Sequence, residues 1–254
     1  MPTDRRAATV AALRAAGCVY AEEEAALLHE AGGDLDAMLA RRVAGEPLEW
    51  VVGWADFAAL RLVVRPGVFV PRRRSELLAA EAIVRLRPAA VAVDLCCGAG
   101  PIAAAILEEV PFVEVHAADV DPAAVACARE NLPNGNVHHG DLFEALPPGL
   151  RGRVDVLVAN TPYVPTTEVA LLPAEARDHE PRHTLDGGPD GLDLLRRISA
   201  AATDWLVPGG HVLIEVSERQ LPVALQIFSS DRLTATSSTN ADLGATVAIG
   251  RAAS

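Results

Sequence analysis

The pattern of hydrophobic and polar positions changes near residue 54. Over residues 4–44, apolar residues recur every three or four positions, which predicts helices, and Gly32-Gly33 interrupts the run just before Asp34, a candidate N-cap. Residues 57–64 have β-type content, Pro66-Gly67 is a turn signal, and residues 68–70 resume the β pattern. We therefore predict a helical domain at residues 1–53 and a β-hairpin linker at residues 54–75.

From residue 76 to residue 254, helix-like and strand-like patterns alternate. The predicted helices are 76–86, 102–110, 123–131, 192–205 and 218–228. The predicted strands are 90–94, 113–119, 137–140, 154–159 and 211–216. Such alternation is typical of a doubly wound, mostly parallel sheet, and two last β-like runs, 233–238 and 245–250, predict an antiparallel hairpin at its edge. The predicted class is α/β, with a Rossmann-like domain at residues 76–254.

Composition and charge narrow the possible partners. The chain has 254 residues, half of them hydrophobic and 22% charged, which is typical of a globular protein. All basic residues are Arg, and the net charge of -12 resides in residues 76–254, so this domain is a poor match for nucleic acid. No apolar run approaches the roughly 18 residues of a membrane span, no signal peptide is evident, and the four cysteines form no CxxC pair. We expect a cytoplasmic protein without a direct nucleic-acid or membrane partner.

A glycine turn follows the first predicted strand of the sheet. The segment starts at Asp94 and continues through Cys96, Cys97, Gly98, Ala99 and Gly100 into Pro101. Ligands bind at the carboxyl ends of parallel strands, glycines let the backbone approach them, and a following helix presents free N–H groups to an anionic group. The segment predicts part of a ligand site, with an ordinary strand–helix turn as the alternative.

Acidic residues end the next two predicted strands. Asp119 lies about 20 residues after the glycine turn, where a carboxylate commonly binds two ribose hydroxyls. A helix N-cap is the alternative role, although Asp121 before Pro122 is the better cap. Asp141, followed by Leu142, can accept a hydrogen bond from an exocyclic amino group such as that of adenine. Together these positions predict a nucleoside-containing cofactor.

The fourth predicted strand ends in Asn160, Thr161, Pro162 and Tyr163. Asn160 offers an oxygen that can accept a hydrogen bond from an N–H substrate, and Tyr163 offers a flat wall. An Asx-turn before proline explains the amide but not the aromatic ring. A hydride-transfer enzyme has no need of this set, whereas a methyltransferase acting on a planar nitrogen does.

Taken in order, these motifs resemble the protein-(glutamine-N5) methyltransferases, the HemK-type release-factor methyltransferases, over most of the chain. The four residues 160–163 resemble the Asn-Pro-Pro-Tyr signature of that family. Further matching stretches are 45–53, 66–72, 180–181, 185–192, 206–210 and 213–215.

The resemblance implies a class I S-adenosylmethionine-dependent methyltransferase that modifies the glutamine of a Gly-Gly-Gln sequence in a peptide chain release factor. It implies that residues 96–100 hold the methionine part of the cofactor, Asp119 the ribose, and Asp141 with Leu142 the adenine. Residues 160–163 would hold the substrate amide, partly through the main-chain carbonyl of Thr161, and residues 1–53 would recognise the substrate. Asp94 and Asn160 are candidate cofactor-binding residues as well.

The sequence departs from the family pattern at three places. Cys96 stands where the family usually has glycine, Thr161 replaces the first proline of the signature, and Arg73-Arg74-Ser75-Glu76 replaces a Pro-Glu-Thr-Glu-like stretch. These departures leave open a paralogue that methylates a nitrogen of another protein or of a small molecule. From other classes, an NAD(P)-binding oxidoreductase and a non-catalytic binding module are the alternatives. The sequence does not define the oligomeric state.

Histidine and arginine clusters suggest other roles. Residues 179–183 match the zinc-protease pattern H-E-x-x-H, but Pro181 interrupts the helix which that site requires, so we predict no metal. His138-His139 is expected on a loop surface. The run Arg72-Arg73-Arg74 is expected to be a solvated surface, with a partner contact as the alternative.

Overall fold

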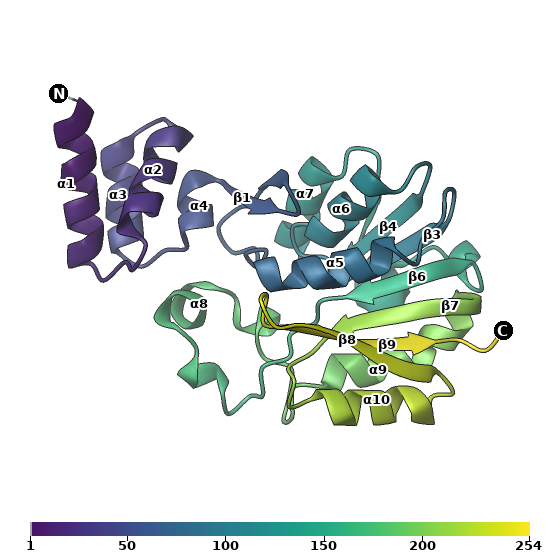
Figure 1. Ribbon diagram of the computed structural model, residues 1–254. Helices are drawn as coiled ribbons and strands as arrows, with labels where there is room; N and C mark the ends of the chain where they lie inside the picture. Colours follow the sequence, from purple (N-terminus) through teal and green to yellow (C-terminus); the bar gives the residue numbers. More distant parts are fainter. Residues whose placement is uncertain (1) are drawn as a thin grey trace.

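The computed structural model describes residues 2–254, and its first part is a small helical unit (Figure 1). The helices of this unit are α1 (Pro2–Ala15), α2 (Ala21–Ala31), α3 (Leu35–Val43) and α4 (Leu48–Val52). Asp34 caps α3, because its side chain accepts hydrogen bonds from the N–H groups of Asp36 and Ala37. Leu13, Leu28 and other buried apolar side chains give the unit a hydrophobic core of its own.

A hairpin follows the helices, but its turn does not lie where the sequence pattern placed it. Strand β1 (Trp54–Phe57) pairs with β2 (Leu60–Val63) through a turn at Ala58 and Ala59, with φ angles of 48° and 62°. Two-residue hairpin turns need positive φ, which usually selects glycine or asparagine, so these alanines gave no turn signal. Residues 65–68 do form a turn, but residues 68–70 are not a strand, and that part of the prediction was wrong.

The larger part of the chain is built on a seven-stranded sheet with the order β5-β4-β3-β6-β7-β9-β8. Strands β5 to β7 are parallel, while β9 and β8 are antiparallel at one edge, which confirms the predicted fold class. The strands are β3 (Val91–Leu95), β4 (Glu114–Asp119), β5 (Asn136–His139), β6 (Val154–Ala159), β7 (Leu206–Glu215), β8 (Thr234–Asn240) and β9 (Ala245–Arg251).

Helices cover both faces of the sheet (Figure 1). The helices of this part are α5 (Glu76–Ile83), α6 (Pro101–Glu109), α7 (Pro122–Asn131), α8 (Ala174–His179), α9 (Asp193–Trp205) and α10 (Leu221–Ser230), and short 3₁₀ helices cover Arg73–Ser75, Leu142–Ala145, Pro148–Leu150, Val169–Leu171 and Arg182–Thr184. Helices α5, α6 and α7 pack on one face through side chains such as Leu78 and Ile106. Helices α9 and α10 pack on the other through Ile198, Trp205 and Phe228.

The order of the strands determines where ligands can bind. The chain runs outward from β3 through β4 to β5 and then returns to place β6 on the other side of β3. The boundary between β3 and β6 is therefore the topological switch point, where crevices open at the carboxyl ends of the strands.

His138 and His139 lie in the edge strand β5, which agrees with the strand predicted at residues 137–140, whereas the expectation that they lie on a loop surface was wrong. The ring of His138 stacks on that of the buried His116 in β4, with 5.2 Å between the ring centroids. The two imidazole rings therefore pack against each other on the neighbouring strands β4 and β5.

Candidate functional site

A cavity of about 790 Å³ lies at the carboxyl ends of β3, β4 and β6. Its wall includes eleven of the residues singled out from the sequence: Cys96, Cys97, Gly98, Ala99, Asp119, Asp141, Leu142, Asn160, Thr161, Pro162 and Tyr163. The two other predicted residues, Asp94 and Gly100, lie outside the wall. The volume is in the range of small-molecule binding sites.

The glycine turn contributes one wall of the cavity. Gly98 has a φ of +55°, and a Cβ added there would meet nothing within 4 Å, so the backbone is open on this side. Cys96 also has a positive φ, 56°, a conformation that costs a non-glycine residue about 1–2 kcal/mol. This left-handed backbone conformation explains why glycine is usual at this position in the family that the sequence resembles. Gly100 has a packing role instead, because a Cβ there would come within 2.9 Å of Leu132.

Asp119 is fixed at the end of β4 by two backbone N–H groups. Its Oδ2 accepts a hydrogen bond from Gly98 and its Oδ1 accepts one from Asp121, each at 2.9 Å. Burial raises the pKa of Asp119, and the two N–H donors oppose that effect. Each oxygen retains a lone pair, so the carboxylate is held ready to accept further hydrogen bonds. Asp121 caps α7, as the sequence predicted.

Asp94 lies beneath the glycine turn and is only 1% exposed. Its Oδ2 accepts a hydrogen bond from the N–H of Ala103 at 3.2 Å, while its Oδ1 is buried without a partner. Burial raises the pKa of Asp94 to about 8. Buried carboxylate oxygens are normally satisfied, and a pKa of about 8 keeps Asp94 protonated at neutral pH, so it carries an unused hydrogen-bonding capacity rather than a charge.

Asp141 differs from its expected role because one of its oxygens is already paired. Arg197 of α9 reaches the Oδ2 of Asp141 at 2.7 Å, and both residues line the cavity. No sequence signal pointed to Arg197, because it lies 56 residues from Asp141, within the predicted helix 192–205, to which no site role was assigned. One carboxylate oxygen of Asp141 remains available.

A polar group at the end of β6 forms another part of the cavity wall. Asn160 Nδ2 donates a hydrogen bond to Ser75 Oγ at 3.0 Å, and Tyr163 Oη donates one to Glu215 Oε1 at 3.1 Å. The guanidinium carbon of Arg74 lies 5.9 Å from the centre of the Tyr163 ring. Burial is the main cause of the raised pKa of Tyr163, which keeps its hydroxyl protonated. The family resemblance placed the stretch with Arg74 and Ser75 beside the active site and matched residues 213–215, but the sequence assigned no role to Arg74, Ser75 or Glu215 individually.

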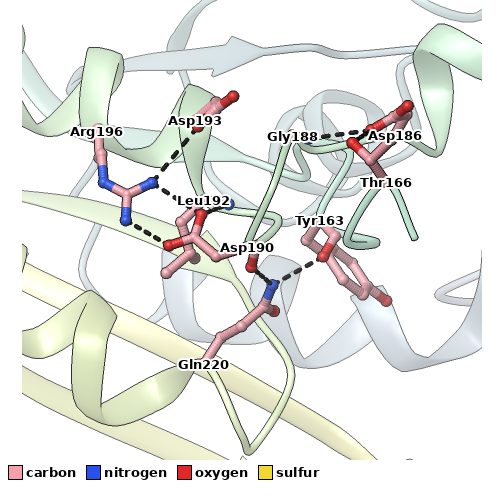
Figure 2. A network of polar contacts seen from close by, with 9 residues as sticks. All are labelled: Tyr163, Thr166, Asp186, Gly188, Asp190, Leu192, Asp193, Arg196 and Gln220. Carbon is pink, nitrogen blue, oxygen red and sulfur yellow. Dashed lines mark hydrogen bonds and ion pairs between the residues drawn. The ribbon is translucent and has the colours of Figure 1, made fainter. Parts of the chain in front are cut away.

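The backbone at Tyr163 is held by Gln220 and by a glycine-rich loop (Figure 2). Gln220 is 8% exposed, and its Nε2 donates to the carbonyl oxygens of Tyr163 and Asp190 at 2.8 and 2.9 Å. A Cβ on Gly191 would stand 2.1 Å from the Tyr163 oxygen, and a Cβ on Gly187 2.4 Å from the Pro162 oxygen. Only glycines allow this approach, so the loop sets the position of the strand end.

The arginine run is not a purely solvated surface, contrary to our expectation. Arg72 forms an ion pair with Glu180, a residue only 5% exposed, and Arg74 lies 3.9 Å from the buried carboxylate of Glu215. Arg73 is exposed. Two of the three arginines therefore belong to the wall of the cavity.

The H-E-x-x-H sequence does not form a helical pair of histidines. Helix α8 ends at His179, and His183 lies in the next short 3₁₀ helix, after Pro181. Within residues 2–254 no group of three or more His, Cys, Asp or Glu side chains is arranged to hold a metal ion.

The known proteins that resemble this chain in sequence are methyltransferases. Residues 59–176 match the family model described as a methyltransferase small domain. The chain is 40% identical to a release factor glutamine methyltransferase of Streptomyces coelicolor, over 88% of this chain and 86% of the relative. It is 35% identical to a 4-amino-L-phenylalanine/4-methylamino-L-phenylalanine methyltransferase of Streptomyces pristinaespiralis, over 78% and 74% of the two chains.

A solved structure supports the fold. The crystal structure of a methyltransferase from Pyrococcus furiosus superposes with a TM-score of 0.59 at 18% identity, covering 78% of this chain and 91% of that chain. Among the helices of residues 2–254, none is long and apolar enough to cross a membrane.

Proposed function

The chain belongs to the family of release factor glutamine methyltransferases, and from this premise we propose that it methylates the side-chain amide nitrogen of a glutamine in a peptide chain release factor, with S-adenosylmethionine as the methyl donor. One observation carries the proposal: the glycine turn, Asp119 and residues 160–163 all line the same cavity. The reaction requires this arrangement, because donor and acceptor must meet in one enclosed space. The expected location is the cytoplasm, where release factors act.

The cofactor residues fit S-adenosylmethionine, which supplies a methyl group on a sulfonium. The open backbone at Gly98 would accommodate the methionine part, and Asp94, with its unpaired Oδ1, precedes that turn in β3. Asp119 keeps lone pairs for two ribose hydroxyls. Asp141, with one oxygen bound to Arg197, and Leu142 would contact the adenine, since both line the cavity.

An amide nitrogen is a weak nucleophile because its lone pair is delocalised into the carbonyl. Fixing two reactants in a productive geometry can contribute about 7–11 kcal/mol to catalysis. The Oδ1 of Asn160 and the main-chain carbonyl of Thr161 would accept the two N–H hydrogens of the glutamine amide. These two hydrogen bonds would fix the direction of the nitrogen lone pair. Bound S-adenosylmethionine would supply the methyl group to that nitrogen, with S-adenosylhomocysteine as the leaving group and the excess proton released to solvent.

The helical domain, proposed as residues 1–53, would recognise the protein substrate, with residues 54–75 as its link to the catalytic domain at 76–254. Arg42 of α3, 11% exposed in its side chain, forms ion pairs with Glu24 of α2 at 2.7 Å and with Glu175 of α8 at 2.6 Å. Glu175 also lines the cavity. The helical domain is thus braced against the cavity, where it can hold a substrate protein.

A second candidate substrate is a small aromatic amine that carries a carboxylate. The side chain of Arg74 is 47% exposed and lines the cavity beside Tyr163, where its charge can pair with such a carboxylate. The similarity to the methyltransferase that acts on 4-amino-L-phenylalanine favours testing this candidate.

The test is single-turnover methylation of a purified release factor that contains Gly-Gly-Gln, followed by mass spectrometry of the tryptic peptide. We expect a gain of one methyl group on that glutamine. A release factor with Gln replaced by Glu is the matched control. If the protein binds S-adenosylhomocysteine and does not bind NADH, it is a methyltransferase rather than an NAD(P)-dependent oxidoreductase. Bound cofactor without methylation of the release factor, together with methylation of 4-amino-L-phenylalanine, would move the assignment to the second candidate.

A further inference from the structure

One ion pair joins helix α9 to the segment that follows β5. Arg197 of α9 and Asp141 both line the cavity, and Arg197 Nη2 donates a hydrogen bond to Asp141 Oδ2 at 2.7 Å. Leu194, one turn before Arg197 in the same helix, also lines the cavity. Helix α9 therefore contributes a charged and an apolar side chain to the cavity wall.

The exposure of this ion pair indicates that its main role is not to stabilise the fold. The side chains of Arg197 and Asp141 are 51% and 45% exposed. Ion pairs so open to water are screened and contribute little to the free energy of unfolding. In the described part of the chain, Asp141 is the one carboxylate with which Arg197 pairs. An effect of Arg197 on a bound ligand is therefore expected to pass through Asp141.

The ion pair restricts the carboxylate of Asp141. A free carboxylate turns readily about its last side-chain torsion, which has a broad, two-fold energy profile. With Oδ2 held by Arg197, the remaining oxygen Oδ1 can accept a hydrogen bond from only a narrow range of directions. An acceptor that is already ordered also loses less conformational freedom when a ligand binds.

Adenine and hypoxanthine differ at the edge that such a carboxylate can recognise. Adenine carries an amino group on C6, and its N–H donates a hydrogen bond. Hypoxanthine carries an oxygen on C6, which would oppose the carboxylate as acceptor against acceptor, and it has an N–H on the neighbouring ring nitrogen. A carboxylate held in one direction accepts from the amino group alone. A carboxylate that is free to turn can also reach the N–H of the ring nitrogen.

We propose that Arg197 is a positioning residue that gives the cavity its preference for adenine, by holding Asp141 so that Oδ1 accepts the C6 amino group. Arg197 acts through Asp141 and does not contact the base edge itself. The inference rests on the proposed function, in which Asp141 and Leu142 contact the adenine of S-adenosylmethionine. It adds the residue that selects the base.

Two ligands that differ only at this edge provide the test. S-adenosylhomocysteine and S-inosylhomocysteine are titrated into the full chain by calorimetry, and the readout is the ratio of their Kd values. We expect the wild type to bind the adenosyl ligand at least about 30-fold more tightly, and Arg197→Ala to lower this ratio to about threefold. Arg197→Lys keeps a cation beside the carboxylate without the planar fork, and should retain a ratio of about tenfold.

Arg196→Ala is the matched control for these variants. Arg196 is the neighbouring residue of α9 and is also about half-exposed, but it pairs with Asp190, and neither residue lines the cavity (Figure 2). This variant should keep the ratio of the wild type. A fall in the ratio equal to that of Arg197→Ala would overturn the inference, because any loss of charge from α9 would then have the same effect.

A double variant tests whether Arg197 acts through Asp141. Asp141→Ala should bind S-adenosylhomocysteine about tenfold more weakly, and adding Arg197→Ala should change that affinity by less than about twofold. A further loss in the double variant would overturn the inference. So would equal weakening of both ligands in Arg197→Ala, since Arg197 would then contact another part of the cofactor, and so would equal binding of the two ligands by the wild type. A wild type that does not bind S-adenosylhomocysteine at all would refute the proposed function itself, so the two failures are distinguishable.

Discussion

Two parts of the cavity wall, named the cofactor end and the acceptor end after their proposed roles, are built in different ways. The cofactor end, made by residues 96–99, Asp119, Asp141 and Leu142, comes from strand ends and the turns directly after them. The acceptor end, made by residues 160–163, depends on side chains brought from distant parts of the chain. Asn160 meets Ser75 across 85 residues, Tyr163 meets Glu215 across 52, and Gln220 reaches the Tyr163 carbonyl across 57.

This difference matches the two tasks. A cofactor of fixed shape can be held by backbone N–H groups and carboxylates that every strand–helix turn of the sheet supplies. An acceptor amide must be oriented, which demands side chains held firmly by further side chains. We therefore expect changes at the acceptor end to reduce the rate, and changes at the cofactor end to reduce affinity.

The largest effect should follow Gly191→Ala at the acceptor end. The added Cβ would stand 2.1 Å from the Tyr163 oxygen and 2.4 Å from Gln220 Nε2, so the strand end must move. Because a displacement of about 1 Å can cost 100-fold in rate, we expect a loss of about 100-fold in kcat with cofactor affinity nearly unchanged. Single-turnover methylation and calorimetry measure the two quantities. Gly149→Ala is the control, since its Cβ would meet nothing within 4 Å. Equal losses of rate and affinity would remove the distinction between the two ends.

Asp119→Ala should give the next largest effect, this time on affinity. The variant removes the carboxylate proposed to bind two ribose hydroxyls, and charge-assisted hydrogen bonds of this kind contribute about 1.5–3 kcal/mol. We expect S-adenosylhomocysteine to bind at least about tenfold more weakly by titration calorimetry. Asp36→Ala, in the exposed part of α3, serves as the matched control. An unchanged affinity would exclude Asp119 from the cofactor site.

The same contrast explains how much could be predicted from the sequence. The glycine turn, Asp119 and residues 160–163 were found because each is a short pattern at a strand end, and the parallel sheet places such ends together. Their presence in one cavity agrees with that reasoning, while their roles stay predictions. Ser75, Arg197, Glu215 and Gln220 were assigned no role, because one polar residue at helical or strand spacing carries no signal of a partner more than 50 residues away. The hairpin turn was misplaced because alanines occupy its positive-φ positions.

Asp94 offers a pH-dependent test of the cofactor end. Its pKa is about 8 in the folded protein and near the ordinary 3.8 when unfolded, so the folded state holds the proton more tightly. Stability from this group is fully present below about pH 4 and is lost as the pH rises toward 8. Relative to Asp94→Asn, the wild-type protein should lose about 1 kcal/mol for each pH unit between 5 and 8. Chemical denaturation across this range measures the slopes, with Asp36→Asn as the control. Parallel slopes would show that Asp94 is ionised in the folded protein.

Thr161→Pro should give the smallest effect, although it changes the acceptor end itself. Thr161 is 4% exposed, and the hydrogen bonds found for residues 2–254 outside regular helices and strands include none from its N–H. Proline would therefore remove no donor that the fold uses, and it restores the first proline of the family signature. The carbonyl proposed to accept the substrate N–H stays in place, and the fixed φ reduces the freedom of the unfolded chain.

We expect kcat within about threefold of the wild type and a stability gain of about 0.5 kcal/mol, by single-turnover methylation and urea denaturation. Thr184→Pro is the contrasting variant, because the Thr184 N–H donates to the Pro181 carbonyl at 2.9 Å and its loss should destabilise the fold. A large loss of rate in Thr161→Pro with unchanged stability would show that this chain uses a backbone angle at position 161 which proline cannot adopt. The acceptor end would then differ from the family in its main chain as well as in its side chains, and the substrate would have to be sought among other nitrogens.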